Sequence, residues 1–165
     1  MIFVSVGTHE APFDRMLEAV HALELEEELI VQYGPSSVRS PKPGVEEHEY
    51  LPFDDVVANI RRARAVVMHA GVGSVMISLA NGKRPIVLAR RHQFGEHVDN
   101  HQVELARRME AGGLVTFVED GDELAQALNA AAQPAGRMNG VPWLGDDLAE
   151  YLAEQLGPRE LAATA

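Results

Sequence analysis

The chain has 165 residues, a formal net charge of −11 at pH 7 and 46% hydrophobic residues. These values are typical of one globular domain with its own core, and the negative charge argues against binding to nucleic acid or to anionic lipid. The absence of cysteine excludes disulfides and thiolate metal sites. The first residues predict a strand and not a signal peptide, and no apolar run is long enough to cross a bilayer. We therefore expect a cytoplasmic protein that meets a membrane only peripherally.

Strand-like and helix-like segments alternate along residues 1–132, which we expect to form the main domain. The predicted strands are the apolar runs at 2–6, 29–33, 65–68, 86–89 and 114–118, with a shorter one at 47–51. The predicted helices, marked by apolar residues at helical spacing, are 13–23, 53–60, 75–81, 100–110 and 122–132. Because this alternation is typical of right-handed β-α-β units, we expect an α/β fold with a Rossmann-like, mostly parallel sheet.

The remaining residues predict three further segments. Residues 133–142 are rich in Pro and Gly and predict a linker. Residues 143–156 predict an amphipathic helix with an apolar stripe, and residues 157–165 a frayed tail.

The most informative stretch follows the predicted strand at 65–68. Two glycines there bend the chain between a strand and a helix, which leaves backbone N–H groups facing whatever lies in front of the helix. Together with the helix dipole, these groups favour a phosphate or diphosphate. A Ser hydroxyl in such a loop caps the helix or donates to the ligand. The candidate binding residues are His69, Ala70, Gly71, Val72, Gly73 and Ser74.

A second polar segment follows the next strand, so both segments are expected at the carboxyl edge of the sheet, where open α/β sheets bind ligands. Its candidate binding residues are Gln93, Gly95, Glu96, His97, Asn100 and Gln102. Directly before them, Arg90-Arg91-His92 is placed to meet a phosphate. His97 and His101 have the spacing of helical zinc ligands, but a helix that begins at Asn100 would separate them, so we expect no metal site.

The turn after the first predicted strand carries one glycine. Gly7-Thr8 is not a G-x-G-x-x-G fingerprint, so the sequence argues against an NAD-dependent enzyme. His9 follows this turn, and it either packs locally, donates to a phosphate or faces an acceptor.

Three ordered motifs carry a family resemblance: His69-Ala-Gly-Val-Gly-Ser74, Gly82-Lys-Arg-Pro85 and Gly95-Glu-His-Val-Asp-Asn-His-Gln102. Together they resemble the C-terminal domain of family 28 glycosyltransferases. The opening, Phe3-Val-Ser-Val-Gly-Thr-His-Glu10 with Pro12-Phe-Asp-Arg15, is similar to the small single-domain members. These are the PssE-type exopolysaccharide proteins and the catalytic subunit of the eukaryotic dolichol-linked N-acetylglucosaminyltransferase. The resemblance runs from residue 1 to about 128.

The resemblance implies the donor-binding half of a two-domain GT-B glycosyltransferase. A UDP-sugar would be the donor, with no other cofactor, and a lipid-diphosphate-linked saccharide the acceptor in exopolysaccharide or capsule synthesis. Because the acceptor-binding half is not among the predicted segments, it implies a separate, membrane-anchored subunit that recruits this chain to the inner face of the membrane. The transfer would invert the sugar's configuration, aided by N–H dipoles at the leaving diphosphate. The alternative is a nucleotide-sugar-binding regulatory or scaffolding subunit without catalysis of its own.

The resemblance also implies roles for individual residues. Gly7 and Thr8 would face the same diphosphate as the Gly71 loop, while Glu96, Asn100 and Gln102 would bind sugar hydroxyls. His9 is the candidate general base, unless the partner supplies one. The chain departs from many relatives at Ile77, where a glutamate binds the ribose hydroxyls, so ribose contact would pass to another group such as Ser78.

Overall fold

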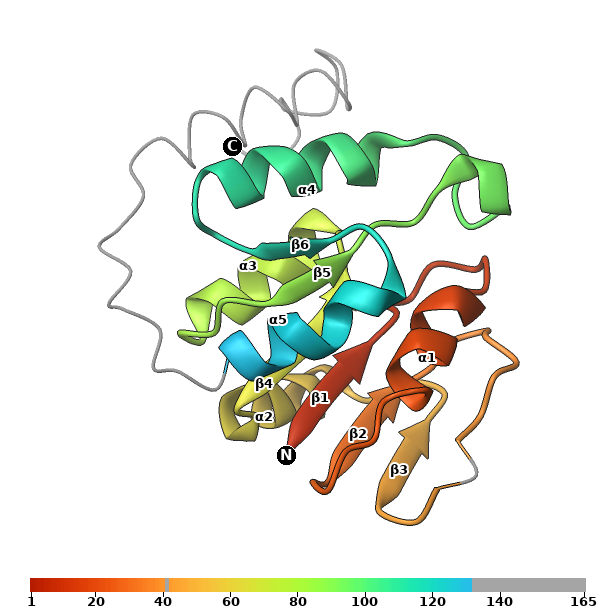
Figure 1. Ribbon diagram of the computed structural model, residues 1–165, viewed down its shortest axis with the longest axis vertical. Helices are drawn as coiled ribbons and strands as arrows, with labels where there is room; N and C mark the ends of the chain where they lie inside the picture. Colours follow the sequence, from red (N-terminus) through yellow and green to blue (C-terminus); the bar gives the residue numbers. More distant parts are fainter. Residues whose placement is uncertain (41, 132–165) are drawn as a thin grey trace. The chain divides into compact units, whose positions relative to one another are not determined.

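A parallel sheet forms the middle of the computed structural model, which describes residues 1–40 and 42–131 (Figure 1). Within these residues the sheet has six strands in the order β3-β2-β1-β4-β5-β6. The strands are β1 (Ile2–Ser5), β2 (Leu29–Gln32), β3 (Val45–His48), β4 (Ala65–His69), β5 (Ile86–Leu88) and β6 (Thr116–Val118). Every neighbouring pair is parallel. The predicted α/β fold is confirmed.

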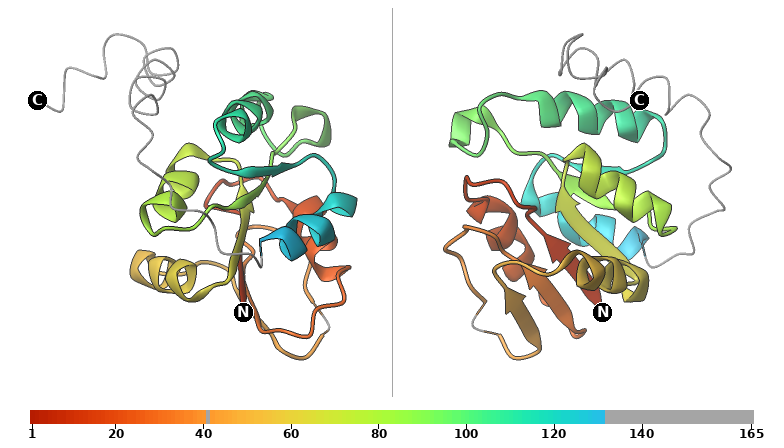
Figure 2. Two further views of the ribbon diagram at one scale, coloured as in Figure 1. Left: turned by 60° about the vertical axis from the view of Figure 1, so that its left-hand side comes forward. Right: turned by 180° about the vertical axis from the view of Figure 1, so that it is seen from behind.

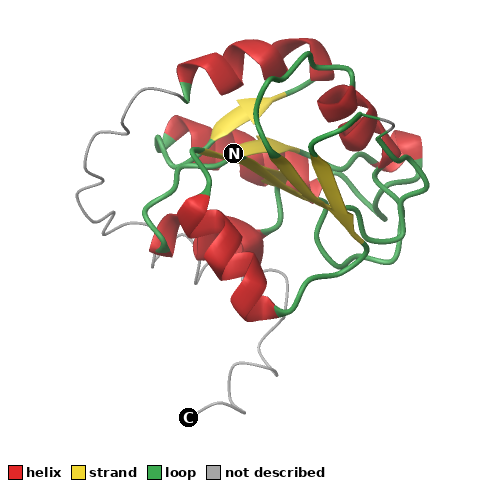
Figure 3. Cartoon of the chain, turned by 90° about the horizontal axis from the view of Figure 1, so that it is seen from below, coloured by secondary structure: helices red, strands yellow, loops and turns green. Residues whose placement is uncertain are grey.

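Helices cover both faces of this sheet. They are α1 (Asp14–His21), α2 (Phe53–Arg62), α3 (Val72–Ala80), α4 (His101–Ala111) and α5 (Leu124–Ala130), with short 3₁₀ turns at His92–Phe94 and Gly121–Glu123. Helices α1 and α5 lie over one face and α2 and α3 over the other, as the views from the front, from behind and from below show (Figures 1, 2 and 3). Helix α4 packs against β6. This three-layer arrangement explains why the central strands are apolar on both faces.

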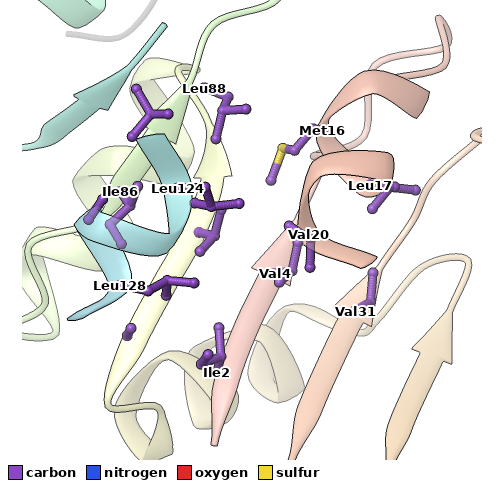
Figure 4. Packing of buried hydrophobic residues seen from close by; sticks show 14 of the residues in the cluster. Ile2, Val4, Met16, Leu17, Val20, Val31, Ile86, Leu88, Leu124 and Leu128 are labelled. Atoms are coloured by element: carbon purple, nitrogen blue, oxygen red, sulfur yellow. The ribbon is translucent and has the colours of Figure 1, made fainter. Parts of the chain in front are cut away.

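The best-defined part of the core lies between the sheet and the pair α1 and α5 (Figure 4). Alternate strand residues such as Ile2, Val4 and Ile86 point toward these two helices. They meet Met16, Leu17 and Val20 of α1 and Leu124 and Leu128 of α5. Each fully buried aliphatic side chain of this kind contributes about 1.5–3 kcal/mol. The core therefore fixes the strands whose carboxyl ends carry the candidate site.

The observed boundaries differ from the predicted ones at two places near functional loops. Helix α3 begins at Val72 and not at residue 75, because Gly71 holds the extended backbone of an N-cap (φ −79°, ψ 133°) and the two residues after Val72 already belong to the first turn. Strand β3 covers Val45–His48 and not 47–51; it is an edge strand without a buried residue, so its hydrophobic pattern is weak. The predicted linker, amphipathic helix and tail at 133–165 lie outside the described residues. Within the described part, no helix is long and apolar enough to cross a membrane.

The strand order sets the place of the site. From β1 the sheet grows to β2 and β3 on one side and to β4, β5 and β6 on the other. Loops that leave the carboxyl ends of β1 and β4 therefore turn to opposite faces of the sheet. Ligands of open α/β sheets bind at this switch point. Gly7 lies in the loop after β1 and Gly71 in the loop after β4, so both glycines lie at this switch point. We call the edge of the sheet formed by the carboxyl ends of the strands the carboxyl edge.

Candidate functional site at the carboxyl edge of the sheet

The ring of His69 lies between two glycines at the switch point. His69 ends β4 and is 9% exposed. A Cβ atom added at Gly7 or at Gly71 would overlap this ring, and Gly7 also has a positive φ of 82°. The two glycines are therefore required by the packing of the imidazole, which brings the β1 and β4 loops together.

His69 is neutral near pH 7. Burial, with a smaller contribution from the positive charge of Arg90, lowers its pKa from 6.5 to about 4. Its Nδ1 atom is buried without a hydrogen-bond partner among the described residues. The neutral His69 ring therefore packs between the two loops, and the positive charge of the site must come from other groups.

Buried polar side chains at the ends of β1 and β2 hold the Gly7 turn in place. The Ser5 hydroxyl accepts a hydrogen bond from the Gly7 N–H at 3.2 Å, and the Gln32 side-chain amide donates to that hydroxyl and to the Gly7 carbonyl. The Gln32 side-chain oxygen also accepts from the Leu51 N–H at 3.1 Å. Thr8, in contrast, is exposed at the edge. Ser5 and Gln32 are positioning residues that the sequence interpretation missed, because both lie inside predicted apolar strands.

The N-terminus of α3 opens at the same edge. Its first intrahelical hydrogen bond runs from the Val75 N–H to the Gly71 carbonyl at 3.1 Å, so the N–H groups of Val72, Gly73 and Ser74 precede it. No side chain caps these groups within the described residues, and Gly71 holds the N-cap position. Of the two roles expected for Ser74, capping is therefore wrong, and donation to a ligand stays a prediction. Gly73 is exposed, and a Cβ atom there would meet nothing within 4 Å. Backbone donors thus face open space beside a helix dipole, which suits an anion.

Arg90 lies under this edge with its side chain fully buried. Its guanidinium donates to the carbonyls of Val6 at 2.9 Å and Ala11 at 2.8 Å, and at 3.2 Å to those of Pro12 and Glu96. It also lies 4.7 Å from the centre of the Phe13 ring. The expectation that Arg90 meets a phosphate directly is wrong, because these contacts occupy it inside the protein. Its charge remains: burial lowers its pKa only to about 10.

Glu96 is likewise occupied within the protein. Its carboxylate accepts two hydrogen bonds from the Arg15 guanidinium, both at 3.0 Å, and one from the Arg91 N–H at 2.9 Å. Its side chain is only 6% exposed. The expectation that Glu96 binds a sugar hydroxyl does not fit this geometry, in which it ties the β5 loop to α1. Arg91 turns away toward Glu119, so it does not face the site either.

The side-chain amides of Asn100 and Gln102, in the β5–α4 segment, each bind the backbone through their oxygen atom. The Asn100 side-chain oxygen accepts from the His92 N–H at 3.0 Å, and that of Gln102 from the Arg90 N–H at 3.2 Å. Their NH₂ groups are the ends available for a sugar hydroxyl. Gln93 and Gly95 are exposed in the same loop, and Gly95 takes a positive φ of 68° where the 3₁₀ turn ends. These four residues keep their predicted place at the carboxyl edge.

Two histidines from different loops meet beside the glycine turns. The rings of His9 and His97 have their centres 5.1 Å apart. The His9 Nδ1 accepts a hydrogen bond from the Ala11 N–H at 3.0 Å, while the His97 Nδ1 lies 3.1 Å from a carboxylate oxygen of Asp99. The His101 Nδ1 lies 2.7 Å from the same oxygen. Burial, the Arg90 charge and the nearby His97 lower the pKa of His9, against a smaller opposite effect of Glu10.

Ser78 is not placed to contact a ribose. It is fully buried, and its hydroxyl donates to the Lys83 carbonyl at 3.0 Å. The expectation for Ser78 is therefore wrong, because this bond closes the turn after α3. Ile77 is partly buried on the same helix.

The family pattern of the glycosyltransferase family 28 C-terminal domain matches residues 1–139. The chain belongs to this family. The resemblance inferred from the sequence motifs is therefore confirmed, and the carboxyl edge described above is that of a glycosyltransferase domain.

Curated relatives of this family 28 domain include subunits of a larger enzyme. The UDP-N-acetylglucosamine transferase subunit ALG13 of Yarrowia lipolytica is 32% identical over 122 residues, which are 66% of this chain and 60% of the relative. The Homo sapiens protein of the same name is 32% identical over 124 residues, 68% of this chain and 10% of the relative. The chain therefore matches 60% of the first relative's length and 10% of the second's.

Solved structures with the same fold are GT-B glycosyltransferases. The glycosyltransferase of kitacinnamycin has a TM-score of 0.58 at 22% identity, over 93% of this chain and 38% of that chain. CalG4, the calicheamicin glycosyltransferase, has a TM-score of 0.58 at 18% identity, over 95% of this chain and 44% of that chain. At these identities the likeness concerns the fold, and the family 28 domain corresponds to less than half of each neighbour.

Proposed function

We propose that this chain is the donor-binding, catalytic subunit of an inverting glycosyltransferase that uses a UDP-sugar. The observation that carries the proposal is the pair of loops at the switch point: His69 is clasped by Gly7 and Gly71, and the uncapped N-terminus of α3 opens beside it. N–H groups that precede the first helical hydrogen bond bind the oxygens of a diphosphate. They also stabilise the charge that develops on the diphosphate as it leaves.

Arg90 supports the same ligand from below. Its guanidinium is buried and donates to carbonyl oxygens, which carry no formal charge and so do not neutralise it. This charge lowers the pKa of His9 and His69 and adds positive potential at the carboxyl edge. A diphosphate that lies on the α3 N–H groups would be attracted without touching this side chain. We therefore propose that binding needs no metal, since backbone dipoles and Arg90 supply the positive charge.

The names of the relatives suggest a donor sugar and a partner subunit. We take UDP-N-acetylglucosamine as the first donor to test, because the relatives are named as UDP-N-acetylglucosamine transferase subunits. The NH₂ groups of Asn100 and Gln102 would meet its hydroxyls. We also propose a membrane-anchored partner subunit, because the relatives are named as subunits of a transferase. The acceptor that we propose, a lipid-diphosphate-linked saccharide in exopolysaccharide or capsule synthesis, rests on the family resemblance of the sequence motifs.

Titration calorimetry with the full chain tests the proposal. UDP should bind, uridine should bind far more weakly because it lacks the diphosphate, and EDTA should leave the UDP affinity unchanged. Equal affinities for UDP and uridine would contradict the diphosphate assignment. Loss of UDP binding in EDTA would contradict the metal-free one and would point to His97, Asp99 and His101 as a metal site.

A further inference from the structure

The two neighbouring histidines at the carboxyl edge present different nitrogen atoms. The His9 Nδ1 accepts a hydrogen bond from the Ala11 N–H at 3.0 Å, so this nitrogen carries a lone pair. A neutral ring then has its proton on Nε2. His9 at the edge is therefore a hydrogen-bond donor and lacks the free lone pair that a base requires. This argues against His9 as the general base and favours a role toward a phosphate oxygen.

His97 has the opposite arrangement. Its Nδ1 lies 3.1 Å from the Oδ1 atom of Asp99, a contact that needs a proton between the two atoms because both otherwise carry lone pairs. A neutral ring then leaves Nε2 unprotonated. The Asp99 N–H lies 3.4 Å from the same Nδ1, a longer contact than the 3.1 Å to the carboxylate, and the ionised carboxylate makes the stronger hydrogen bond. Two bonds from His101, one from its N–H at 3.0 Å and one from its ring, hold Asp99 in place.

We propose that His97, oriented by Asp99, is the general base of the transfer reaction and that His9 is a donor to the departing diphosphate. The inference rests on the proposed function and assigns residues to its chemical step. As the acceptor oxygen attacks the anomeric carbon, its proton passes to the Nε2 atom of His97. The bond from that carbon to the diphosphate oxygen breaks, and its electron pair leaves with UDP. The Asp99 carboxylate stabilises the resulting imidazolium, which releases its proton to water.

Three features of the site support the assignment of His97 as the base and His9 as the donor. The rings lie 5.1 Å apart, so a donor and a base face one bound sugar from adjacent loops. His9 lies two residues after Gly7, whose turn packs against the His69 ring, so the pair of rings lies at the switch point. The His97 side chain is 21% exposed, which leaves it accessible to an acceptor while Asp99 holds its orientation.

Histidine tautomers in the full chain give a test that needs no substrate or partner. Long-range ¹H–¹⁵N correlation spectra of histidine-labelled protein at neutral pH distinguish a proton on Nδ1 from one on Nε2. We expect an Nε2–H ring for His9 and Nδ1–H rings for His97 and His101. In Asp99→Asn a fraction of His97 should change to the Nε2–H form. An Nε2–H tautomer for His97 in the wild-type chain would overturn the assignment.

Variant kinetics and binding then test the chemical step. With UDP-N-acetylglucosamine as donor and the partner subunit present, His97→Gln should lower kcat by about 10²- to 10⁴-fold. Its KM for the donor and its UDP affinity should stay within about twofold, since a general base acts after binding. His9→Gln should instead weaken UDP binding. His101→Gln removes the ring contact with Asp99 but keeps the bond from the His101 N–H, so it should lower kcat much less than His97→Gln does.

The outcomes separate this inference from the proposed function. A wild-type chain that fails to bind UDP would contradict the proposed function, whereas the tautomers would still decide the assignment. A chain that binds UDP and transfers sugar, but retains full turnover in His97→Gln, would refute only the role of His97. Equal losses of turnover in His97→Gln and His101→Gln would also refute it, because both would then act by supporting the loop.

Discussion

Gly73 is predicted to be required by the ligand and not by the fold. Gly7 and Gly71 are explained inside the protein, because a side chain at either would overlap His69. Gly73 has neither a positive φ nor any atom within 4 Å of an added Cβ, and it lies in the first turn of α3. Glycine lowers helix stability, so its presence at an open position of this helix has no structural benefit.

The substitution Gly73→Ala should therefore change stability and binding in opposite directions. In the absence of ligand, alanine should stabilise the chain by about 0.5–1 kcal/mol, because the helical backbone at Gly73 accepts it without strain. With UDP, the added methyl group should hold the diphosphate away from the N–H groups of the first turn. Losing such a charged hydrogen bond costs about 1–3 kcal/mol, or roughly 5- to 150-fold in Kd.

Urea unfolding without ligand and calorimetry with UDP measure the two effects. Ala58→Gly in α2 is a suitable control, because Ala58 is an exposed helical position remote from the loops. It should lose up to about 1 kcal/mol of stability and keep the wild-type UDP affinity. The reasoning fails if Gly73→Ala destabilises the chain without a ligand, or if it binds UDP as tightly as wild type.

Two further predictions concern buried polar groups below the edge. Because the pKa of His69 is about 4 when folded and 6.5 when unfolded, the unfolded chain gains a proton first as the pH falls, and stability is lost between about pH 6.5 and 4. Between pH 7 and 5 this loss is about 2 kcal/mol, and urea unfolding should show it in wild type and not in His69→Gln. Arg15→Met should cost about 2–3 kcal/mol by leaving the buried Glu96 carboxylate without its partner. Arg107→Met, which breaks an exposed pair with Glu119, should have a much smaller effect on stability. Equal losses in these two variants would contradict the proposed importance of the Arg15–Glu96 pair.

The fold was largely predictable because its signals are local. The apolar runs at β1, β2, β4 and β5 are bounded by polar residues and glycines, and the helices between them have regular spacing. Glycines also marked the Gly7 and Gly71 loops. The edge strand β3 was displaced by two residues, since Glu46, Glu47 and His48 give no alternating pattern that fixes its ends.

The chemistry of the site was less predictable because its contacts join residues far apart in the sequence. Arg90 donates to the carbonyl of Val6, which lies 84 residues away, and Glu96 pairs with Arg15 over 81 residues. A sequence shows that these residues are charged and follow a strand, but not that they face inward. The contacts of the histidines are local, in contrast. The tautomer of His9 depends on a bond from the Ala11 N–H, and Asp99 lies two residues from both His97 and His101. An Asp between two histidines was therefore the sequence signal that could have indicated an oriented histidine.

Arg90 allows the effect of charge to be separated from the effect of hydrogen-bond geometry. Its guanidinium joins Val6 and Ala11 of the β1 loop to Glu96 of the β5 loop, and those loops carry His9 and His97. Lysine keeps the positive charge, but its ammonium group has no planar fork that reaches these carbonyls together. In Arg90→Lys we therefore expect the pKa of His69 to stay well below 6.5, while UDP binding weakens and the turnover falls because the two loops separate. NMR titration of His69 measures the first effect, and calorimetry the second. If Arg90→Lys binds UDP like wild type, the positive charge alone is sufficient for binding. Contacts other than the Arg90 hydrogen bonds would then hold His9 beside His97.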